Sequence, residues 1–436
     1  ADSVTWVFTL RNDAKIAPNK YGVLERVIDA TDVKASFDFI ADKATASNGY
    51  PFFNTWVDKT EVVDPQTFRL ITKKPYAFTE ASLGNWLFCA IAPKEWIGKG
   101  SDQMKADSVG AGAFILKNLT ESSVADMVPN PNYWDTGRPY LDQYSIKLFG
   151  DQATYRAAFQ SKQIDSYGPS DKDEGEALKN AEKGVIHTSD PSLQYLTFWM
   201  NTRIKPWDDP RARRAVNMAI DRNEYVQIIG KGGGEPIGPL SYAFKNEALP
   251  QDVLAKLQPF DVAGAKTLFE QAGVKELPFS YPTLGNTADY VNIFVRQMQA
   301  AGVTAKATAL DTGTWLAQYF ASTINASLGL NQTYNTPNDA LQWYHTGGYV
   351  GNGKYDTGFS DPQVDKAIDD AAGIPDPAAR AKAYQDLQKL ILSKDPALVN
   401  FFGTRSETVY RDFVQNYPVG LSSLASAMTK TIWLNK

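Results

Sequence analysis

Cysteine and histidine are almost absent from this sequence of 436 residues, which contains one cysteine, Cys89, and two histidines, His187 and His345. A single cysteine excludes a disulfide within the chain. These three residues lie far apart in the sequence and do not have the spacing of a transition-metal site. We therefore expect no metal site and no cofactor, and we expect each histidine to be exposed or hydrogen-bonded.

Long apolar runs are also absent. No stretch approaches the roughly 18 uninterrupted apolar residues that suggest a membrane-spanning helix, so no membrane span is predicted. No leader of charged, apolar and small residues precedes Ala1, so we expect any signal peptide to lie outside this sequence. The net charge of −5 disfavours contact with the phosphates of nucleic acids, so no nucleic-acid partner is expected.

Catalytic motifs are missing as well. The chain has no G-x-S-x-G motif and no Ser-x-x-Lys pair. The glycines at 229–238 lack the order of a phosphate-binding loop, and the segment GAG at 110–112 lacks the third glycine of a dinucleotide fingerprint. Paired carboxylates such as Asp208 and Asp209 are explained by helix capping. We expect no catalytic residues, and a protein that binds rather than one that catalyses.

Aromatic residues, by contrast, are abundant. Ten Trp, 21 Tyr and 22 Phe make up 12% of the chain. Most of these rings are expected in cores and lobe interfaces. A cleft lined by amphipathic rings is the functional alternative, and it would suit peptides, sugars or other organic solutes. The chain is longer than one typical domain, so we expect two or three lobes.

Strand-like and helix-like segments interleave irregularly, which indicates an α/β protein with mixed sheets rather than a barrel of eight even repeats. Alternating patterns predict a strand at 4–11, a hairpin at 60–72 and a strand that ends at 149. Helical spacing predicts helices at 30–44, 151–165, 260–273, 360–373 and 376–395.

Polar residues before these helices predict their caps. We expect Thr31 and Asp261 to be N-caps, and Ser360 to form a capping box with Gln363. The spacing of the last helix places three residues on its buried face: Tyr384, Leu387 and Ile391.

The passage 195–222, "YLTFWMNTRIKPWDDPRARRAVNMAIDR", places an aromatic strand, a Pro-Trp corner and an Arg-rich helix close together. Asp209 is expected to cap the helix, with Pro210 at its first position, where the missing N–H costs nothing. Asp221 is expected to start a second helix, with Glu224 as its capping-box partner.

This passage also resembles a segment of the bacterial extracellular solute-binding proteins, family 5, which reads N-x-x-x-x-P-[FW]-x-D-x-R-x-R-x-A-[IVL]-x-x-A-[IVL]-D-R. The matching positions are Asn201, Pro206, Trp207, Asp209, Arg211, Arg213, Ala215, Ala219, Asp221 and Arg222. Further segments resemble the family in the family's order, among them "VVDPQTFRLITKKPYA", "GAGAFILK", "NPNYWDTGRPYLD" and "DVAGAKTLFEQAG". The resemblance covers essentially the whole chain.

The resemblance implies a two-lobed fold like that of the periplasmic binding proteins (class II type), with mixed sheets and an extra subdomain on the first lobe. We expect the subdomain at 1–140, the first lobe at 141–240 with 405–436, and the second lobe at 241–404. The family normally has some dozens of residues before the strand at 4–11, so the N-terminal part of the first lobe is expected to be missing from this sequence.

The family captures peptides, dipeptides, nickel chelates or oligosaccharides in a cleft between lobes joined by a hinge, and delivers them to ABC importers. The resemblance therefore implies a periplasmic or extracellular monomer whose partners are a small solute, either a peptide or an oligosaccharide, and the permease subunits of an ABC importer. A lipid anchor at a missing N-terminus stays open. A secreted carbohydrate-active enzyme and a sensor or chaperone with the same fold are the alternatives.

The resemblance also implies which residues line the cleft. These are Trp86, Tyr167, Trp199, Asn331, Gln332, Thr333, Tyr334 and Asn335. Peptide binders of the family carry an aspartate that holds the α-ammonium of the peptide, and Thr333 stands in its place. The hydroxyl of Thr333 and the amides of its neighbours Asn331, Gln332 and Asn335 carry no charge. They favour a neutral polyhydroxylated solute, or a solute whose amine is blocked or turned elsewhere. A carboxylate from another segment, for instance Asp339, is the alternative anchor.

Overall fold

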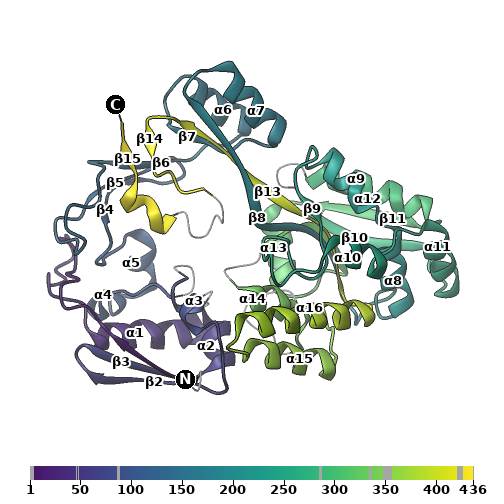
Figure 1. Cartoon of the computed structure of the whole chain (residues 1–436), viewed down its shortest axis with the longest axis horizontal. Coiled ribbons are helices and arrows are strands. Elements are labelled where there is room, and N and C mark those ends of the chain that lie inside the picture. The colour runs from purple at the N-terminus through teal and green to yellow at the C-terminus, as the bar shows by residue number, and fades with distance from the viewer. Residues whose placement is uncertain are drawn as a thin grey trace. The chain divides into compact units, whose positions relative to one another are not determined.

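The computed structural model describes residues 4–45, 47, 49–85, 89–283, 287–332, 336–346, 356–419 and 426–435. The chain folds as two compact units (Figure 1). The first unit comprises Ala1–Ser189 and Glu407–Lys436, and the second comprises Asp190–Ser406. The three-part division expected from the sequence stays a prediction.

A mixed sheet forms the centre of the second unit. Its strands are β8 (Val185–Met200), β9 (Glu235–Pro236), β10 (Glu276–Pro282), β11 (Thr304–Leu310), β12 (Ala326–Gln332) and β13 (Leu398–Arg411). Their order is β11-β10-β12-β8-β13, and β9 pairs with β13. β10 runs parallel to β11 and to β12, whereas β12 runs antiparallel to β8. The mixed sheet predicted from the sequence is thereby confirmed.

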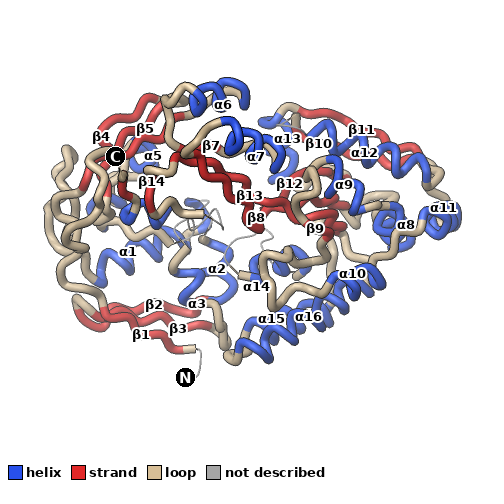
Figure 2. Tube along the Cα trace, turned by 45° about the horizontal axis from the view of Figure 1, so that its top comes forward, coloured by secondary structure: helices blue, strands red, loops and turns tan. Residues whose placement is uncertain are grey.

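Nine α-helices in the described part of the second unit pack around this sheet. They are α8 (Pro210–Ala219), α9 (Arg222–Ile228), α10 (Gln251–Leu257), α11 (Val262–Gln271), α12 (Thr287–Ala300), α13 (Thr312–Phe320), α14 (Pro337–Leu341), α15 (Pro362–Ala372) and α16 (Pro377–Ser393). A short 3-10 helix, η2 (Gln342–Tyr344), follows α14. α15 and α16 lie side by side in both the cartoon and the tube view (Figure 2).

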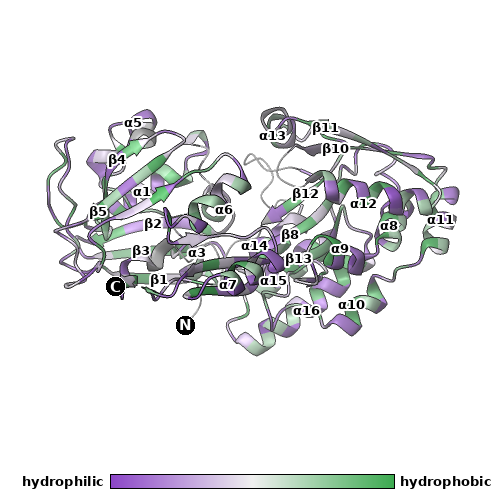
Figure 3. Ribbon diagram, turned by 90° about the horizontal axis from the view of Figure 1, so that it is seen from above, coloured by the Kyte–Doolittle hydropathy of each residue, from purple (hydrophilic) through white to green (hydrophobic). Residues whose placement is uncertain are grey.

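One face of the sheet carries the main hydrophobic core. Leu196, Phe198 and Met200 alternate along β8 and are fully buried in it. Small residues of α8, among them Ala215 and Ala219, let that helix approach closely. Figure 3 shows green and purple residues mixed on α8, α11 and α12, as expected for helices that are buried on one side only.

The caps of α8 and α9 follow most of the sequence prediction. Asp209 accepts a hydrogen bond from the backbone N–H of Arg211, and Pro210 is the first residue of α8. Asp221 caps α9, as predicted. The predicted capping box is wrong, because the Glu224 carboxylate accepts hydrogen bonds from Arg296 (2.6 Å) and Gln297 (2.7 Å) of α12 instead.

Two other predicted caps are wrong by one or two residues. The first-unit helix α1 (Ala30–Ala41) is capped by Asp29, which forms a capping box with Asp32, and not by Thr31. α15 is capped by Asp361, because Pro362 occupies the first helical position, so the predicted box of Ser360 with Gln363 does not form. Asp261 caps α11 as predicted, and the three residues predicted to face inward on α16 are buried.

The first unit contains two three-stranded sheets. One has the order β1-β3-β2 and the other β4-β5-β6. Their strands are β1 (Thr5–Thr9), β2 (Val57–Asp64), β3 (Thr67–Thr72), β4 (Phe114–Thr120), β5 (Val124–Pro129) and β6 (Tyr144–Lys147). β2 and β3 form the hairpin predicted at 60–72, whereas β6 ends two residues before the predicted strand end at 149.

The helices of the first unit are mostly short. Besides α1 they are α2 (Tyr50–Trp56), α3 (Thr79–Leu83), α4 (Lys94–Ile97), α5 (Ser101–Ala106), α6 (Gln152–Gln160) and α7 (Lys172–Ala181), with the 3-10 helices η1 (Lys43–Thr45) and η3 (Ser426–Thr431). β7 (Ser166–Tyr167) pairs with the end of β13, and β14 (Val414–Gln415) pairs with β15 (Trp433–Leu434). Within the described ranges, no helix is long and apolar enough to cross a membrane.

Candidate functional site

The carboxyl ends of three parallel strands meet at one edge of the second unit. β10 ends at Pro282, β11 at Leu310 and β12 at Gln332, and the register of β10 with its two neighbours brings these ends together. In open α/β sheets, ligands bind outside the carboxyl ends of the strands. The predicted segment 331–335 begins at this edge, which makes the edge our candidate site.

A polar pair lies at the end of β12. Asn331 is opposite Tyr195 of β8, and its side-chain amide donates a hydrogen bond to the Tyr195 hydroxyl (Nδ2 to Oη, 3.0 Å). Both side chains are buried. Burial raises the pKa of Tyr195 well above its ordinary value, so the phenol stays neutral. The pair therefore offers amide and hydroxyl groups, without charge, at the edge of the sheet.

Aromatic rings lie on the same face of the sheet as this polar pair. The Trp199 ring of β8 lies 5.9 Å from the Tyr319 ring and 6.4 Å from the Trp315 ring of α13. Trp315 stacks on Tyr319 at 4.7 Å, and its indole N–H donates to the Ser327 hydroxyl of β12 (2.9 Å). Gly329 leaves room for this arrangement, because an added Cβ would lie 3.3 Å from the Trp199 ring.

The structure thus brings two predicted residues, Trp199 and Asn331, onto one face of the sheet. Trp199 is only 1% exposed, so its ring is part of the packed layer and not an open surface. Trp315, which was not among the predicted site residues, is half-buried and lies beside it. Trp315 and Tyr319 are four residues apart on a helix, and this spacing is the feature of the sequence that could have indicated the aromatic pair.

Tyr167 belongs to the first unit and not to this face. It lies on β7 in a core formed with Phe159 and Val409. Its hydroxyl donates to Glu174 (2.8 Å) and accepts from the Gln152 amide (2.9 Å). Burial and the neighbouring Glu174 carboxylate raise the pKa of Tyr167. Because these partners already satisfy the hydroxyl, the structure gives Tyr167 a packing role, and its place in a binding site stays a prediction.

Most of the remaining predicted site residues lie outside the part of the chain that the structure describes. Trp86, Thr333, Tyr334 and Asn335 lie outside the described residues, and Gln332 is described by its backbone alone. The alternative anchor, Asp339, belongs to the capping box of α14: its Oδ2 accepts from the backbone N–H of Thr336 (3.1 Å). Its carboxylate is therefore already engaged in holding a helix end.

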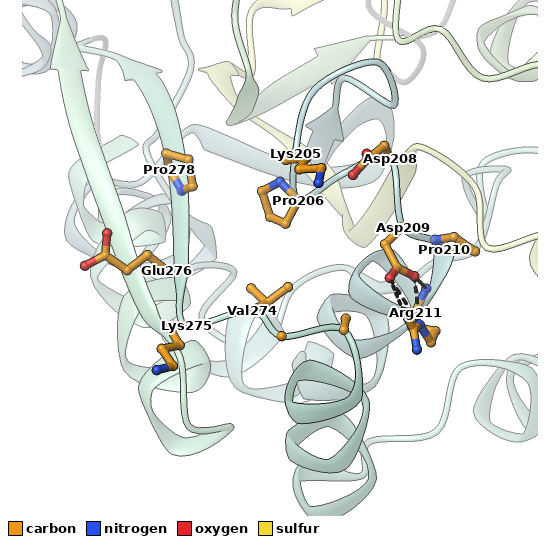
Figure 4. A pocket seen from close by; sticks show the side chains of 12 residues that line it. Lys205, Pro206, Asp208, Asp209, Pro210, Arg211, Val274, Lys275, Glu276 and Pro278 are labelled. Atoms are coloured by element: carbon orange, nitrogen blue, oxygen red, sulfur yellow. Dashed lines mark hydrogen bonds and ion pairs between the residues drawn. The ribbon is translucent and has the colours of Figure 1, made fainter.

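The groove of Figure 4 is a hollow of the second unit, with a volume of about 920 Å³. It lies between the Pro-Trp corner and the start of β10, and Asp209 and Arg211 form an ion pair on one side of it (2.6 Å). Four other charged side chains around it, Lys205, Asp208, Lys275 and Glu276, are exposed. Exposed charges of both signs are typical of a solvated surface, so we do not assign the groove as the site.

The two histidines each have one acidic neighbour. His187 is hydrogen-bonded to Glu407 (2.7 Å), and His345 lies 3.7 Å from Asp369. Among the residues that the structure describes, no three His, Cys, Asp or Glu side chains are grouped so as to hold a metal ion. The prediction that a histidine would be hydrogen-bonded is confirmed for His187.

Comparison with known sequences gives a consistent result. The family model "Bacterial extracellular solute-binding proteins, family 5 Middle" matches residues 1–353. The glutathione-binding protein GsiB of Salmonella paratyphi A is 26% identical over 422 residues, which cover 91% of this chain and 77% of that protein. GsiB of Escherichia coli O157:H7 is 25% identical with the same coverage.

Solved structures agree on the fold. The periplasmic binding protein DppA of Helicobacter pylori, in complex with the peptide STSA, has a TM-score of 0.86 at 19% identity. The match covers 100% of this chain and 87% of the DppA chain. AgaA of A. tumefaciens R10, in complex with agropinic acid, has a TM-score of 0.84 at 19% identity. That match covers 100% of this chain and 88% of the AgaA chain. The predicted fold, that of the two-lobed periplasmic binding proteins, is confirmed. Because the family model covers most of the sequence, the chain belongs to the bacterial extracellular solute-binding proteins, family 5.

Proposed function

We propose that the protein captures a small peptide or another amino-acid-derived solute in a cleft between its lobes and delivers it to the permease of an ABC importer. The observation that carries this proposal is the family match over residues 1–353. The relatives are named for glutathione, a peptide and agropinic acid, which are peptides or amino-acid derivatives. The protein would act as a monomer outside the cytoplasmic membrane, with or without a lipid anchor.

The proposed site is the carboxyl edge of β10, β11 and β12, together with the residues that the sequence resemblance implies. The amide of Asn331 and the aromatic layer of Trp199, Trp315 and Tyr319 support this choice, because solute sites combine apolar walls with a few fixed polar groups. Trp86, Tyr167 and the segment 332–335 belong to the same proposal. We further propose that the lobes close on the solute about a hinge and that the protein has no catalytic activity.

The oligosaccharide alternative has no support from the proteins described above, none of which is named for an oligosaccharide. Thr333 therefore bears only on how the amine of a solute would be held. The question it leaves is which carboxylate of this chain, if any, replaces the missing aspartate.

Isothermal titration calorimetry tests the proposal with glutathione, the tetrapeptide STSA, agropinic acid and a neutral oligosaccharide. We expect one of the first three to bind with a 1:1 stoichiometry and the oligosaccharide not to bind. Asn331→Ala should weaken that binding about tenfold, or by ~1.4 kcal/mol, because it removes the fixed amide. Asn118→Ala, at an exposed position of the first unit, is the control and should bind as the wild type does. Binding of the oligosaccharide alone would refute the proposed solute class.

A further inference from the structure

The chain passes between the two units twice, once along β8 and once along β13. The first unit ends with Ser189 on β8 and resumes with Glu407 on β13. Both strands extend beyond these residues into the second unit, and they are hydrogen-bonded neighbours in one sheet. A ribbon of two strands therefore links the units, and the lobe closure proposed above has to bend this ribbon.

A buried side-chain cluster ties the two strands together at the point where they leave the first unit. Nε2 of His187 is hydrogen-bonded to Oε2 of Glu407 (2.7 Å), and the Ser189 hydroxyl donates to Oε1 of the same carboxylate (2.6 Å). His187 and Ser189 are two positions apart on β8, so their side chains point to the same side of the strand. The side chains of His187 and Glu407 are each only 6% exposed. All three residues belong to the first unit, and we call them the clip.

The core of the first unit holds the clip in place. Val185 of β8 and Val409 of β13, each two residues from a clip residue, are buried in one hydrophobic cluster. An added Cβ at Gly175 of α7 would overlap the His187 ring, so α7 lies directly against that ring. Because a buried carboxylate without hydrogen-bond partners is strongly unfavourable, Glu407 keeps the two strands joined at this point.

Separate contacts fix the ribbon within the second unit. The Thr404 hydroxyl of β13 donates to the backbone carbonyl of Gln194 on β8 (3.1 Å). The Ser241 hydroxyl donates to the backbone carbonyl of Ser192 (3.2 Å), which ties β8 to the segment that follows β9. The ribbon is therefore held by side-chain hydrogen bonds on both sides of the unit boundary.

Two short stretches of the ribbon, 190–191 and 405–406, lie between the clip and these contacts. Pro191 has no backbone N–H, so it cannot donate a hydrogen bond to a neighbouring strand. Hinges in proteins consist of a few residues that absorb changes of backbone angle between rigid parts. We expect 190–191 and 405–406 to form such a hinge.

We infer that the clip of His187, Ser189 and Glu407 confines the bending of the ribbon to 190–191 and 405–406 and thereby strengthens solute binding. This inference rests on the proposed function and adds to it a cluster that acts on affinity from within the first unit. Closure on a solute has to order whatever backbone is free to bend, and each residue ordered costs free energy. A short hinge between fixed contacts keeps this cost small.

Titration calorimetry tests the effect of the clip on affinity, with glutathione, STSA and agropinic acid as the solutes. Glu407→Ala removes the clip and should weaken the binding of any solute that the wild type binds by about tenfold, which corresponds to the ordering of roughly one more residue. Ser189→Ala removes one of the two hydrogen bonds and should have a smaller effect in the same direction. Glu176→Ala, at an exposed carboxyl of α7, is the matched control and should bind as the wild type does.

Hydrogen exchange distinguishes the clip from a purely structural role. In the wild type, a solute should slow exchange at 190 and 405–406, whereas the amides of 187–189 and 407–409 should be protected with and without solute. In Glu407→Ala the solute-dependent change should spread to 187–189 and 407–409. Leu178→Ala makes a cavity in the same core but leaves all three clip residues in place. It should lower the stability of the first unit and leave the affinity unchanged.

The outcomes separate the clip from the proposed function. Thermal unfolding shows whether each variant is folded, and Ser189→Ala tests the clip even if Glu407→Ala does not fold. If the folded clip variants keep the affinity of the wild type, or if Leu178→Ala weakens binding as much as they do, the clip is wrong and the proposed function stands. If none of the three solutes binds the wild type, the proposed function is wrong, and the inferred effect of the clip on binding is wrong with it.

Discussion

Replacing Phe294 by alanine should lower the free energy of unfolding of the second unit by about 3–5 kcal/mol. Phe294 of α12 is fully buried, and its ring lies 4.6 Å from the Phe198 ring, 5.1 Å from the Phe279 ring and 6.2 Å from the Phe401 ring. These three rings come from β8, β10 and β13, so the deletion opens a cavity where three strands and a helix meet. Urea denaturation measures the loss, and amide hydrogen exchange assigns it to the second unit.

Two further variants control this experiment. Phe320→Ala removes a ring that is 52% exposed on α13 and should change the stability by no more than about 0.5 kcal/mol. Phe294→Leu keeps most of the buried volume and should cost clearly less than Phe294→Ala. If Phe294→Ala and Phe320→Ala had equal effects, the core described for the second unit would be wrong.

Asp32→Asn should destabilise the first unit by roughly 3 kcal/mol, because it breaks a buried ion pair. The Asp32 side chain is fully buried, and its Oδ1 accepts from Arg26 (2.6 Å) and from the backbone N–H of Lys94 (2.9 Å). Its Oδ2 accepts from the backbone N–H of Asp29 (2.9 Å), which completes the capping box of α1. An amide at this position presents an NH₂ group to donors and leaves at least one of them unpaired.

The same residue predicts a pH dependence. Burial alone would raise the pKa of Asp32, but the hydrogen bonds from Arg26 and from backbone N–H groups outweigh it, so the pKa lies below its ordinary value. A carboxyl whose pKa is lower in the folded state stabilises that state above its unfolded pKa, about 3.9 for aspartate. This contribution is lost as the pH falls through the folded pKa, that is, below about pH 4.

Urea denaturation between pH 2 and 7 measures both effects of Asp32→Asn, with Asp58→Asn, an exposed carboxyl of the same unit, as the control. The difference in stability between wild type and Asp32→Asn should be largest at neutral pH and should shrink below about pH 4. A difference that stayed constant down to pH 2 would show that the ion pair is not its source.

Local patterns in the sequence predicted much of the secondary structure. The hairpin through Asp64 and Pro65 and the caps at Asp209 and Asp261 depend on residues adjacent in the chain, and the structure has them. The caps at Thr31 and Ser360 were wrong because a second residue able to cap lies close by: Asp29 is two positions before Thr31, and Asp361 directly follows Ser360. Periodicity places a helix, but it does not choose between neighbouring residues that are both able to cap it.

The candidate site was harder to predict because its contacts join distant segments. The hydrogen bond of Trp315 to Ser327 depends on how α13 lies on β12, and the Glu174 partner of Tyr167 depends on how α7 lies beside β7. Sequence spacing contains none of these relations, whereas the resemblance to the family indicated Trp199 and Asn331, which the structure places on one face.

Native mass spectrometry of the purified chain, mixed with glutathione, STSA and agropinic acid, tests most directly the central claim that the protein captures an intact amino-acid-derived solute without converting it. We expect a complex of one chain with one solute molecule. On dissociation, the solute should be released at its original mass. If no complex formed with any of the three solutes, or if the solute were released hydrolysed after turnover by the pure protein, the result would contradict the claim.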